Sequence, residues 1–185
     1  MQSNLSVNNK LIVFITGASG VGKTTLLNNL KVKFSARVNW EFLKFDSIGI
    51  PSTEQMVKEH GSVEEWQRVK TYEWIDKMVN DFPDKEVIIM DGQANLEFIK
   101  TGFTNQNFKN YQIVLVDCEQ DIMVRRLVDE RQQAWLASKD MKNWLKFLRK
   151  QAQDFGEPII ETSSITPAQV VDEFTEILES KGVKT

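Results

Sequence analysis

The stretch with the most specific chemistry is GASGVGKTT, from Gly17 to Thr25. It matches the phosphate-loop pattern G-x-x-x-x-G-K-[S/T] in full, and it follows the apolar run LIVFIT, as that pattern requires. Glycines let the backbone wrap closely around an anion and turn its N–H groups inward, while the helix that follows presents its positive end. The stretch therefore predicts a site for the phosphates of a nucleoside triphosphate.

Three side chains of this loop are expected to contact the phosphates or the metal ion. Lys23 is expected to bridge the β- and γ-phosphates, the Thr24 hydroxyl to ligate Mg²⁺, and Thr25 to reach the α-phosphate. The nucleotide-binding residues predicted in the loop are Gly17, Ser19, Gly20, Val21, Gly22, Lys23, Thr24 and Thr25. The alternative, a glycine-rich turn that binds nothing, is disfavoured by the complete match and its context.

Hydrophobic patterning predicts the elements that position this loop. Short apolar runs predict five buried strands, at residues 11–16, 40–45, 87–91 and 112–117 and, more weakly, from Pro158 onwards. Helical segments lie between them, and capping-box patterns mark helix starts at Ser52, Ser62 and Thr166. This alternation predicts one α/β domain over residues 1–185, a three-layer α/β/α sandwich with a five-stranded, mostly parallel sheet.

Charge and composition exclude several classes of protein. A formal net charge of −3 over 185 residues argues against a general attraction to nucleic acid or anionic membranes. No apolar stretch reaches the length of a membrane span, and the first ten residues lack the pattern of a signal peptide, so we expect a cytoplasmic protein. The lone cysteine, Cys118, excludes an internal disulfide and is expected to be buried, and the lone histidine, His60, is expected to end a helix.

Two large classes of phosphate-loop protein fit the sequence poorly. A Ras-like GTPase should carry an N-K-x-D motif late in the chain, and none is present. Asp46 and Gly49 match the D-x-x-G pattern of those proteins, but they come too early, directly after the second predicted strand. Oligomeric ATPases usually have paired acidic residues after an apolar run, whereas VIIMDGQ ends in the single Asp91, which argues against multi-subunit hydrolysis.

Five segments follow one another along the chain: GASGVGKTT, FDSIGIPS, VIIMDGQ, IVLVDCEQDIMVRRLVDERQ and IIETSSITPAQVV. Their order and spacing resemble those of the small P-loop kinases, a group that includes the nucleoside monophosphate kinases and the shikimate, gluconate and antibiotic kinases. The resemblance covers nearly the whole chain, from about Lys10 to Leu178. It implies a P-loop kinase-like fold with a small helical lid, and transfer of the γ-phosphate of Mg-ATP to a small acceptor.

Phosphoryl transfer requires a donor grip, a metal ion, a dry acceptor site and positive charge over the moving group. By resemblance, Asp91 would hold Mg²⁺ through water beside Thr24, and capping of the next turn is the alternative. Asp46 would hold or deprotonate the acceptor hydroxyl, with a turn residue as the alternative. Residues 93–95 replace the aromatic residue, proline and arginine of the adenylate kinase group, which argues against a nucleoside monophosphate acceptor.

The region 125–150 is basic, with eight basic and three acidic residues. On a helix, one face would hold Lys139, Lys142, Lys146, Arg149 and Lys150, and the opposite face Met141, Trp144, Leu145 and Leu148. We therefore predict a helical lid at about residues 131–152, packed on the body by its apolar face with its basic face toward a cleft, where the similar kinases have their lid. Solvated lysines are the alternative for each single cation.

The resemblance also implies roles for three arginines and a loop. Arg126 would line the adenine, and Arg131 is the expected transition-state arginine. The second arginine of the family usually lies four residues after the first, where this chain has Glu130, so Arg149 is a rival for that role. The loop at residues 162–165, with Ser163, would form the remaining wall around the base.

The acceptor side is expected at the helical region of about residues 52–82, and the core at about residues 10–51, 85–130 and 156–181. In the helical region Val63, Trp74 and Met78 share one face with Trp66 at its edge, and we interpret this stripe as core. Three residues of another face are possible acceptor contacts: Glu65, Arg68 and Tyr72.

The leading hypothesis is an ATP-dependent phosphotransferase that uses Mg²⁺ and phosphorylates a small molecule with a hydroxyl or phosphate acceptor group. Lys23, Asp46 and either Arg131 or Arg149 would carry the catalysis. No membrane and no obligate protein partner are expected, and nucleic acid is disfavoured. Two alternatives stay open: a nucleotide-binding regulatory module that hydrolyses slowly and signals to a protein, and a polynucleotide-end kinase whose basic helix holds the backbone.

Overall fold

A single parallel sheet forms the centre of the molecule. The computed structural model describes residues 10–185, so the expectation about a signal peptide lies largely outside the described residues. The strands are β1 (Leu11–Thr16), β2 (Trp40–Lys44), β3 (Val87–Asp91), β4 (Tyr111–Asp117) and β5 (Ile159–Glu161). Their order is β2-β3-β1-β4-β5 and all neighbouring pairs are parallel. The predicted five-stranded α/β fold is confirmed.

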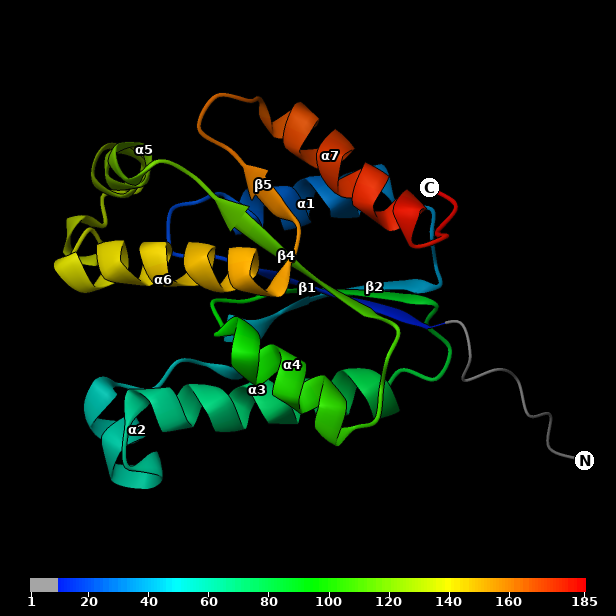
Figure 1. Cartoon of the computed structure of the whole chain (residues 1–185), viewed down its shortest axis with the longest axis horizontal. Coiled ribbons are helices and arrows are strands. Elements are labelled where there is room, and N and C mark those ends of the chain that lie inside the picture. The colour runs from blue at the N-terminus through cyan, green and yellow to red at the C-terminus, as the bar shows by residue number, and fades with distance from the viewer. Residues whose placement is uncertain (1–9) are drawn as a thin grey trace, which may run out of the picture.

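Helices cover both faces of this sheet (Figure 1). They are α1 (Lys23–Lys33), α2 (Thr53–His60), α3 (Val63–Asn80), α4 (Leu96–Asn105), α5 (Gln120–Arg125), α6 (Lys139–Phe155) and α7 (Pro167–Ser180). In Figure 1, α1 and α7 lie on one side of the sheet, and α3 and α4 lie on the other. Short helical turns at Phe45–Ile48, Arg126–Glu130 and Ala134–Leu136 complete the described elements.

The residues of β1 show how the two layers form. Val13 and Ile15 pack in the cluster that contains the apolar residues of α1 and α7, whereas Ile12 and Phe14 pack in the cluster with those of α3 and α4. Successive side chains of a strand point to opposite faces. Because both faces are covered, every residue of β1 is apolar or hydrogen-bonded and buried, as is typical of a central parallel strand.

The predicted helix starts are present. Ser52 and Thr166 form complete capping boxes, in which the hydroxyl accepts from the third helical N–H and the glutamine side chain returns to the cap. At Ser62 only the hydroxyl half forms, because the Glu65 carboxylate pairs with Arg68 instead. His60 ends α2, as expected, since Gly61 follows it with a left-handed φ of 83°.

Strand β2 ends at Lys44, one residue earlier than predicted. Phe45 starts a helical turn instead and buries its ring against Trp66 and Trp74.

The apolar stripe on α3 is part of the core, as interpreted, at Trp66, Trp74 and Met78, whereas Val63 is 43% exposed. Cys118 is buried. Among the described residues, no helix is long and apolar enough to cross a membrane.

Candidate active site

The phosphate loop leaves the central strand between the ends of β3 and β4. At Gly17 the backbone has a φ of +153°, and a Cβ atom there would lie 2.3 Å from the carbonyl oxygen of Val116. Only glycine allows the loop to pass so close to β4. Beyond this point Lys23 folds back over the loop, and its Nζ donates to the carbonyl oxygen of Ala18 at 2.8 Å. The lysine therefore lies over the concave side of the loop.

Thr24 and Asp91 meet at the mouth of the loop. The Thr24 hydroxyl donates to Oδ2 of Asp91 at 2.9 Å, which joins the first turn of α1 to the end of β3. Burial raises the pKa of Asp91, while the positive charge of Lys23 and the hydrogen bond from Thr24 oppose that rise. Burial likewise lowers the pKa of Lys23, opposed by the carboxylates of Asp91 and Asp46. The site thus concentrates opposite charges in a partly buried place.

A pocket of about 130 Å³ opens between these residues, and we call it the phosphate-loop pocket. It is lined by Ser19, Gly20, Gly22, Lys23, Thr24, Lys44, Asp46, Asp91, Gly92, Gln93 and Arg131. Asp46 is exposed on the turn after β2 and lines this pocket. The structure therefore brings together Lys23, Thr24, Asp46, Asp91 and Arg131, although they are far apart in the sequence.

A second pocket, of about 350 Å³, adjoins the first. It is lined by Gly20, Val21, Gly22, Thr25, Leu26, Arg125, Arg126, Glu130, Arg131, Thr162, Ile165, Pro167 and Val170, and we call it the Arg126 pocket. Gly20, Gly22 and Arg131 line both pockets, so the two lie side by side along the phosphate loop.

A π-helical turn brings Arg126 and Arg131 to the same pocket. The N–H of Arg131 donates to the carbonyl oxygen of Arg126 at 3.0 Å, which is the five-residue spacing of a π turn. Such a turn absorbs one extra residue, so Arg131 follows Arg126 by one turn although five positions separate them. The spacing between Arg126 and Arg131 is one residue longer than in the family pattern, and the π turn accounts for this extra residue. Such turns often occur at functional sites.

Arg126 is fixed by the loop after β5. Its guanidinium donates to the carbonyl oxygen of Val21 at 3.3 Å, and to the hydroxyl and the carbonyl oxygen of Thr162 at 2.9 and 2.7 Å. Thr162 is buried and its hydroxyl also donates to Val21. These bonds hold the phosphate loop, the π turn and the loop after β5 in one frame around the Arg126 pocket.

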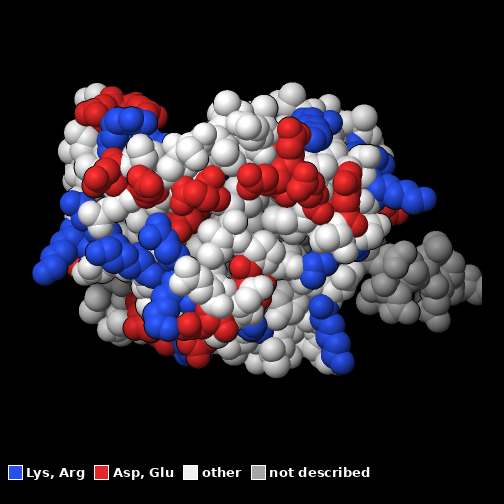
Figure 2. All heavy atoms as spheres, turned by 45° about the horizontal axis from the view of Figure 1, so that its top comes forward, with Lys and Arg blue, Asp and Glu red and all other residues white. Residues whose placement is uncertain are grey.

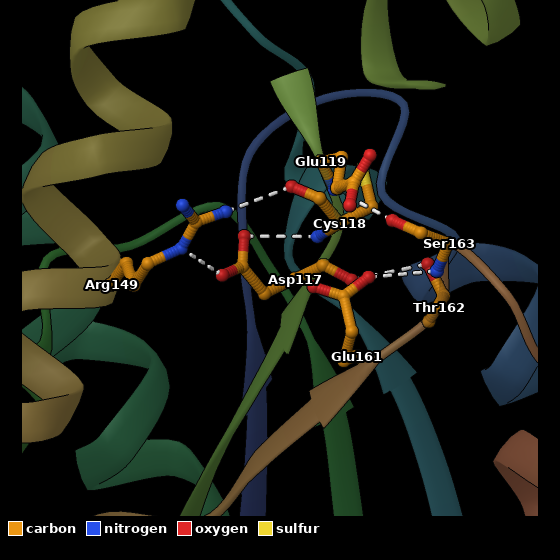
Figure 3. Close-up of polar contacts among 7 residues, drawn as sticks. All are labelled: Asp117, Cys118, Glu119, Arg149, Glu161, Thr162 and Ser163. Carbon is orange, nitrogen blue, oxygen red and sulfur yellow. Dashed lines mark hydrogen bonds and ion pairs between the residues drawn. The ribbon is translucent and has the colours of Figure 1, made fainter. Parts of the chain in front are cut away.

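Arg149 lies beside a different strand end (Figure 3). Its Nε donates to Oδ2 of Asp117 at 2.5 Å, and its Nη2 donates to the carbonyl oxygen of Cys118 at 2.9 Å. The hydrogen bond to Asp117 raises the pKa of Arg149. Arg149 lines neither pocket, which differs from the expectation that it faces the phosphates. The buried carboxylate of Asp117 takes its guanidinium, and Arg131 is the expected arginine that lines the site.

Ser163 also differs from its expected place. Its hydroxyl accepts from the N–H of Glu119 at 2.7 Å, and its own N–H donates to Oε1 of Glu161 at 2.7 Å (Figure 3). The hydroxyl and the N–H of Ser163 are therefore both hydrogen-bonded to residues at or just beyond the ends of β4 and β5. Thr162 and Ile165 of the same loop line the Arg126 pocket, whereas Ser163 does not.

The basic face of α6 does not line the phosphate-loop pocket. Lys139, Lys142, Lys146 and Lys150 line neither this pocket nor the Arg126 pocket, which corrects the expected arrangement of the lid. Figure 2 shows basic side chains gathered at the end of the molecule where α5 and the start of α6 lie in Figure 1. Helix α6 is held to the body by buried Leu145 and Leu148, as expected, whereas Met141 and Trp144 are only half-buried.

Two of the residues that line the site were not identified from the sequence. Lys44 is the last residue of β2 and lines the phosphate-loop pocket. Gln93 lines it too, and its Oε1 accepts from the Ser19 hydroxyl at 3.0 Å. Proximity to the ends of predicted strands was the available signal for both. The expected acceptor contacts on α3 line neither pocket: Arg68 pairs with Glu65 and lies over the Tyr72 ring at 5.5 Å.

Long-range amide bonds fix the segment that contains Gln93. Gln67 of α3 donates to the carbonyl oxygen of Gln93 at 3.1 Å and accepts from the N–H of Asn95 at 3.2 Å. Gln151 of α6 donates to the side-chain oxygen of Asn95 at 2.8 Å and accepts from the N–H of Leu96 at 3.2 Å. Helices α3 and α6 are thereby joined through the loop that follows β3.

The donors in the phosphate-loop pocket fit Mg²⁺. Among residues 10–185 no group of three or more histidine, cysteine or acidic side chains could hold a metal ion by itself. Mg²⁺ does not need such a group, because it usually keeps several waters and binds one or two protein oxygens together with substrate phosphates. The Thr24 hydroxyl and the Asp91 carboxylate supply oxygens of this kind beside the loop.

Comparison with known proteins assigns the chain to a family. A family model described as an AAA domain matches residues 13–142, which is more than half of the chain. This range includes the phosphate loop, Asp46, Asp91 and both arginines of the π turn. A comparison with curated proteins gave no match.

Solved structures share the fold over nearly the full length. Shikimate kinase from Acinetobacter baumannii, in complex with shikimate, superposes with a TM-score of 0.61 at 15% identity, covering 96% of this chain and 97% of that one. Shikimate kinase from Aquifex aeolicus gives 0.59 at 22% identity, with 93% and 98% covered. A gluconokinase from Sinorhizobium meliloti gives 0.61 at 13% identity, with 93% and 95% covered. At such identities the similarity establishes a kinase-like P-loop fold.

Proposed function

Because the chain belongs to the AAA-domain family and has a kinase-like P-loop fold, we propose that it is an ATP-dependent phosphotransferase that phosphorylates a small molecule. One observation carries this proposal. Lys23, Asp91, Asp46 and Arg131 line one pocket, and Arg131 also lines the larger pocket beside Arg126. A nucleotide-binding module that only senses its ligand does not need an acid and an arginine on the open side of the phosphate loop.

The proposed donor site uses both pockets. The base and ribose of ATP occupy the Arg126 pocket, and the phosphates extend along the loop amides to Lys23. Thr24 and Asp91 would hold Mg²⁺, which when bound neutralises charge on the β- and γ-phosphates. Arg131, which lines both pockets, places its positive charge beside the transferring group.

In the proposed reaction an acceptor hydroxyl oxygen attacks the γ-phosphorus, and the bond from that phosphorus to the β–γ bridging oxygen breaks. ADP leaves with the bonding electron pair, and the hydroxyl proton passes to the Asp46 carboxylate. Asp46 is exposed and lines the phosphate-loop pocket, which supports this role because an acceptor must enter from solvent. Positioning and charge stabilisation supply the catalysis.

The proposal is tested by ADP release from Mg-ATP with a panel of hydroxyl compounds, including nucleosides, sugar acids, amino alcohols and aminoglycosides. We expect slow release without an acceptor and a large increase with one class of compound, lost in Lys23→Ala. Rapid ADP release that no acceptor increases would support a hydrolase of the regulatory kind instead. Tight binding of oligonucleotides with a steep salt dependence would support the polynucleotide-end kinase.

A further inference from the structure

An open groove of about 850 Å³ lies beside the phosphate-loop pocket. It is bounded by the start of α3, by the segment after β3 and by the start of α6. Gln93 lines both the groove and the phosphate-loop pocket, so the two meet at this side chain. The volume is in the range of pockets that bind small molecules, up to about 1,000 Å³. The groove therefore lies next to the pocket that Lys23 and Asp46 line.

Large apolar side chains form the walls of the groove: Phe98, Met141, Trp144 and Phe147. The rings of Trp144 and Phe147 are stacked, with centroids 5.3 Å apart and planes at 24°. Phe147 is nevertheless 42% exposed, so part of this aromatic surface is uncovered. A flat apolar ring placed against it would gain from burial and from stacking.

Trp144 also carries an unmet polar group. Its indole Nε1 is buried and has no hydrogen-bond acceptor among the described residues. A buried donor without a partner costs free energy, so the indole would gain stability by turning its N–H toward an acceptor on a bound molecule.

The charge of the groove restricts that ligand. The charged residues that line it are Glu64 and Asp140, and no lysine or arginine of residues 10–185 contributes to its lining. A carboxylate or phosphate on the bound molecule would meet like charge and find no cation to pair with. A neutral molecule meets no such penalty, and an ammonium group would be attracted.

We propose that this groove selects the acceptor: a neutral or positively charged hydroxyl compound with an aromatic or similarly flat apolar body. The body lies against Trp144 and Phe147, and the hydroxyl passes Gln93 toward Asp46. The inference rests on the phosphotransfer proposed above, whose own test is the acceptor-dependent release of ADP. The ligand preference of the groove is tested by binding alone, so that failure of the groove proposal can be told apart from failure of the phosphotransfer proposal.

Two matched sets of hydroxyl probes serve for the binding test. The phenyl set is 3-phenyl-1-propanol, phenylalaninol and 3-phenyllactate, and the indole set is tryptophol, tryptophanol and indole-3-lactate. Each set thus has a neutral, an aminated and a carboxylated member on the same ring. Binding to the full chain with ADP and Mg²⁺ is followed by NMR of ¹³C-methyl methionine, with the Met141 signal assigned from Met141→Leu.

We expect the neutral and aminated probes to shift the Met141 signal and to leave that of Met90, which is buried in the sheet, unchanged. The carboxylated probes should bind about tenfold more weakly, the size of effect that one uncompensated like charge produces. Trp144→Phe should retain ring-dependent binding, and Trp144→Ala should lose it.

Variants identify the source of the charge preference. Glu64→Gln combined with Asp140→Asn should reduce the difference in affinity between the aminated and the carboxylated probes. Glu97→Gln is the matched control, since Glu97 is also an exposed acid in the first turn of a helix but lies outside the groove, and it should leave the difference unchanged. Equal binding of carboxylated probes, or no shift of the Met141 signal by any probe, would overturn the inference.

Discussion

Ser19 and Gln93 connect the phosphate loop to the segment that follows β3, because the Ser19 hydroxyl donates to Oε1 of Gln93 at 3.0 Å. The carbonyl oxygen of Gln93 in turn accepts from Gln67 of α3 at 3.1 Å. The donor loop is thus hydrogen-bonded to a residue that also lines the proposed acceptor groove. Donor and acceptor can be held in a fixed relation by this one residue, which is the requirement of catalysis by positioning.

Gln93→Ala should therefore lower kcat about ten- to a hundredfold while changing the KM for ATP little, since a small misplacement of reacting groups costs rate more than binding. Steady-state kinetics with the best acceptor of the panel measure both constants. Gln153→Ala, at an exposed position of α6, is the control and should behave like the unmodified chain. A rise in the KM for ATP with an unchanged kcat would assign Gln93 to nucleotide binding alone.

Arg131 and Arg149 can be separated by the same substitution at each. Arg131→Lys should lower kcat strongly, toward the thousandfold effect that is about the lower bound for arginines on a transferring phosphoryl group, because lysine cannot reproduce its planar donors. Arg149→Lys should leave the kcat of the folded protein nearly unchanged, since Arg149 lines neither pocket. Steady-state kinetics of both variants measure these effects on kcat. A large loss of kcat in Arg149→Lys with little change in Arg131→Lys would instead identify Arg149 as the catalytic arginine.

The pair of Arg149 and Asp117 should instead contribute to stability. Arg149→Leu leaves the buried Asp117 carboxylate without its cation and should cost about 3 kcal/mol of unfolding free energy, the lower end for a broken buried pair, because Arg149 itself is partly exposed. Adding Asp117→Asn should recover most of that loss. Urea unfolding of the two single variants and the double variant measures the coupling. Strictly additive losses would show that the two side chains do not interact energetically.

Cys118 should be an unreactive thiol. Burial raises its pKa to about 11, with help from Asp117 and Glu161, because the thiolate is disfavoured there. A raised pKa means that the unfolded chain ionises first, so this group lowers stability only as the pH rises from about 9 toward 11. At pH 8 the native protein should react with a disulfide reagent far more slowly than the urea-unfolded chain. Fast, stoichiometric labelling of the native protein would contradict the buried position.

The sheet was predictable because its strands are local apolar runs. Buried runs at residues 11–16 and 87–91 became β1 and β3 with the predicted bounds, since both faces of a central strand need apolar side chains. The phosphate loop, Asp46 and Asp91 could be expected at one edge for the same reason, as carboxyl ends of parallel strands share an edge. Local pattern and chain order contain this information.

The remainder depends on contacts between distant residues. Gln151 and Asn95 are 56 positions apart, and no local pattern indicates that their amides bond. Arg149 was the rival of Arg131 because Glu130 stands where the family has its second arginine, and no local pattern indicated that its guanidinium pairs with the buried Asp117. The π turn before Arg131 changes the spacing of two arginines by one residue, and it is seen only in the backbone hydrogen bond from Arg131 to Arg126.

The central claim is that the γ-phosphoryl group of ATP passes to a small organic molecule. It is tested most directly by incubating the protein with Mg²⁺, γ-¹⁸O-labelled ATP and an extract of small metabolites, and following the label by mass spectrometry. We predict that the label appears in a new organic phosphate, that ADP forms in equal amount, and that Lys23→Ala abolishes both. Label found in inorganic phosphate alone, with or without the extract, would contradict the account.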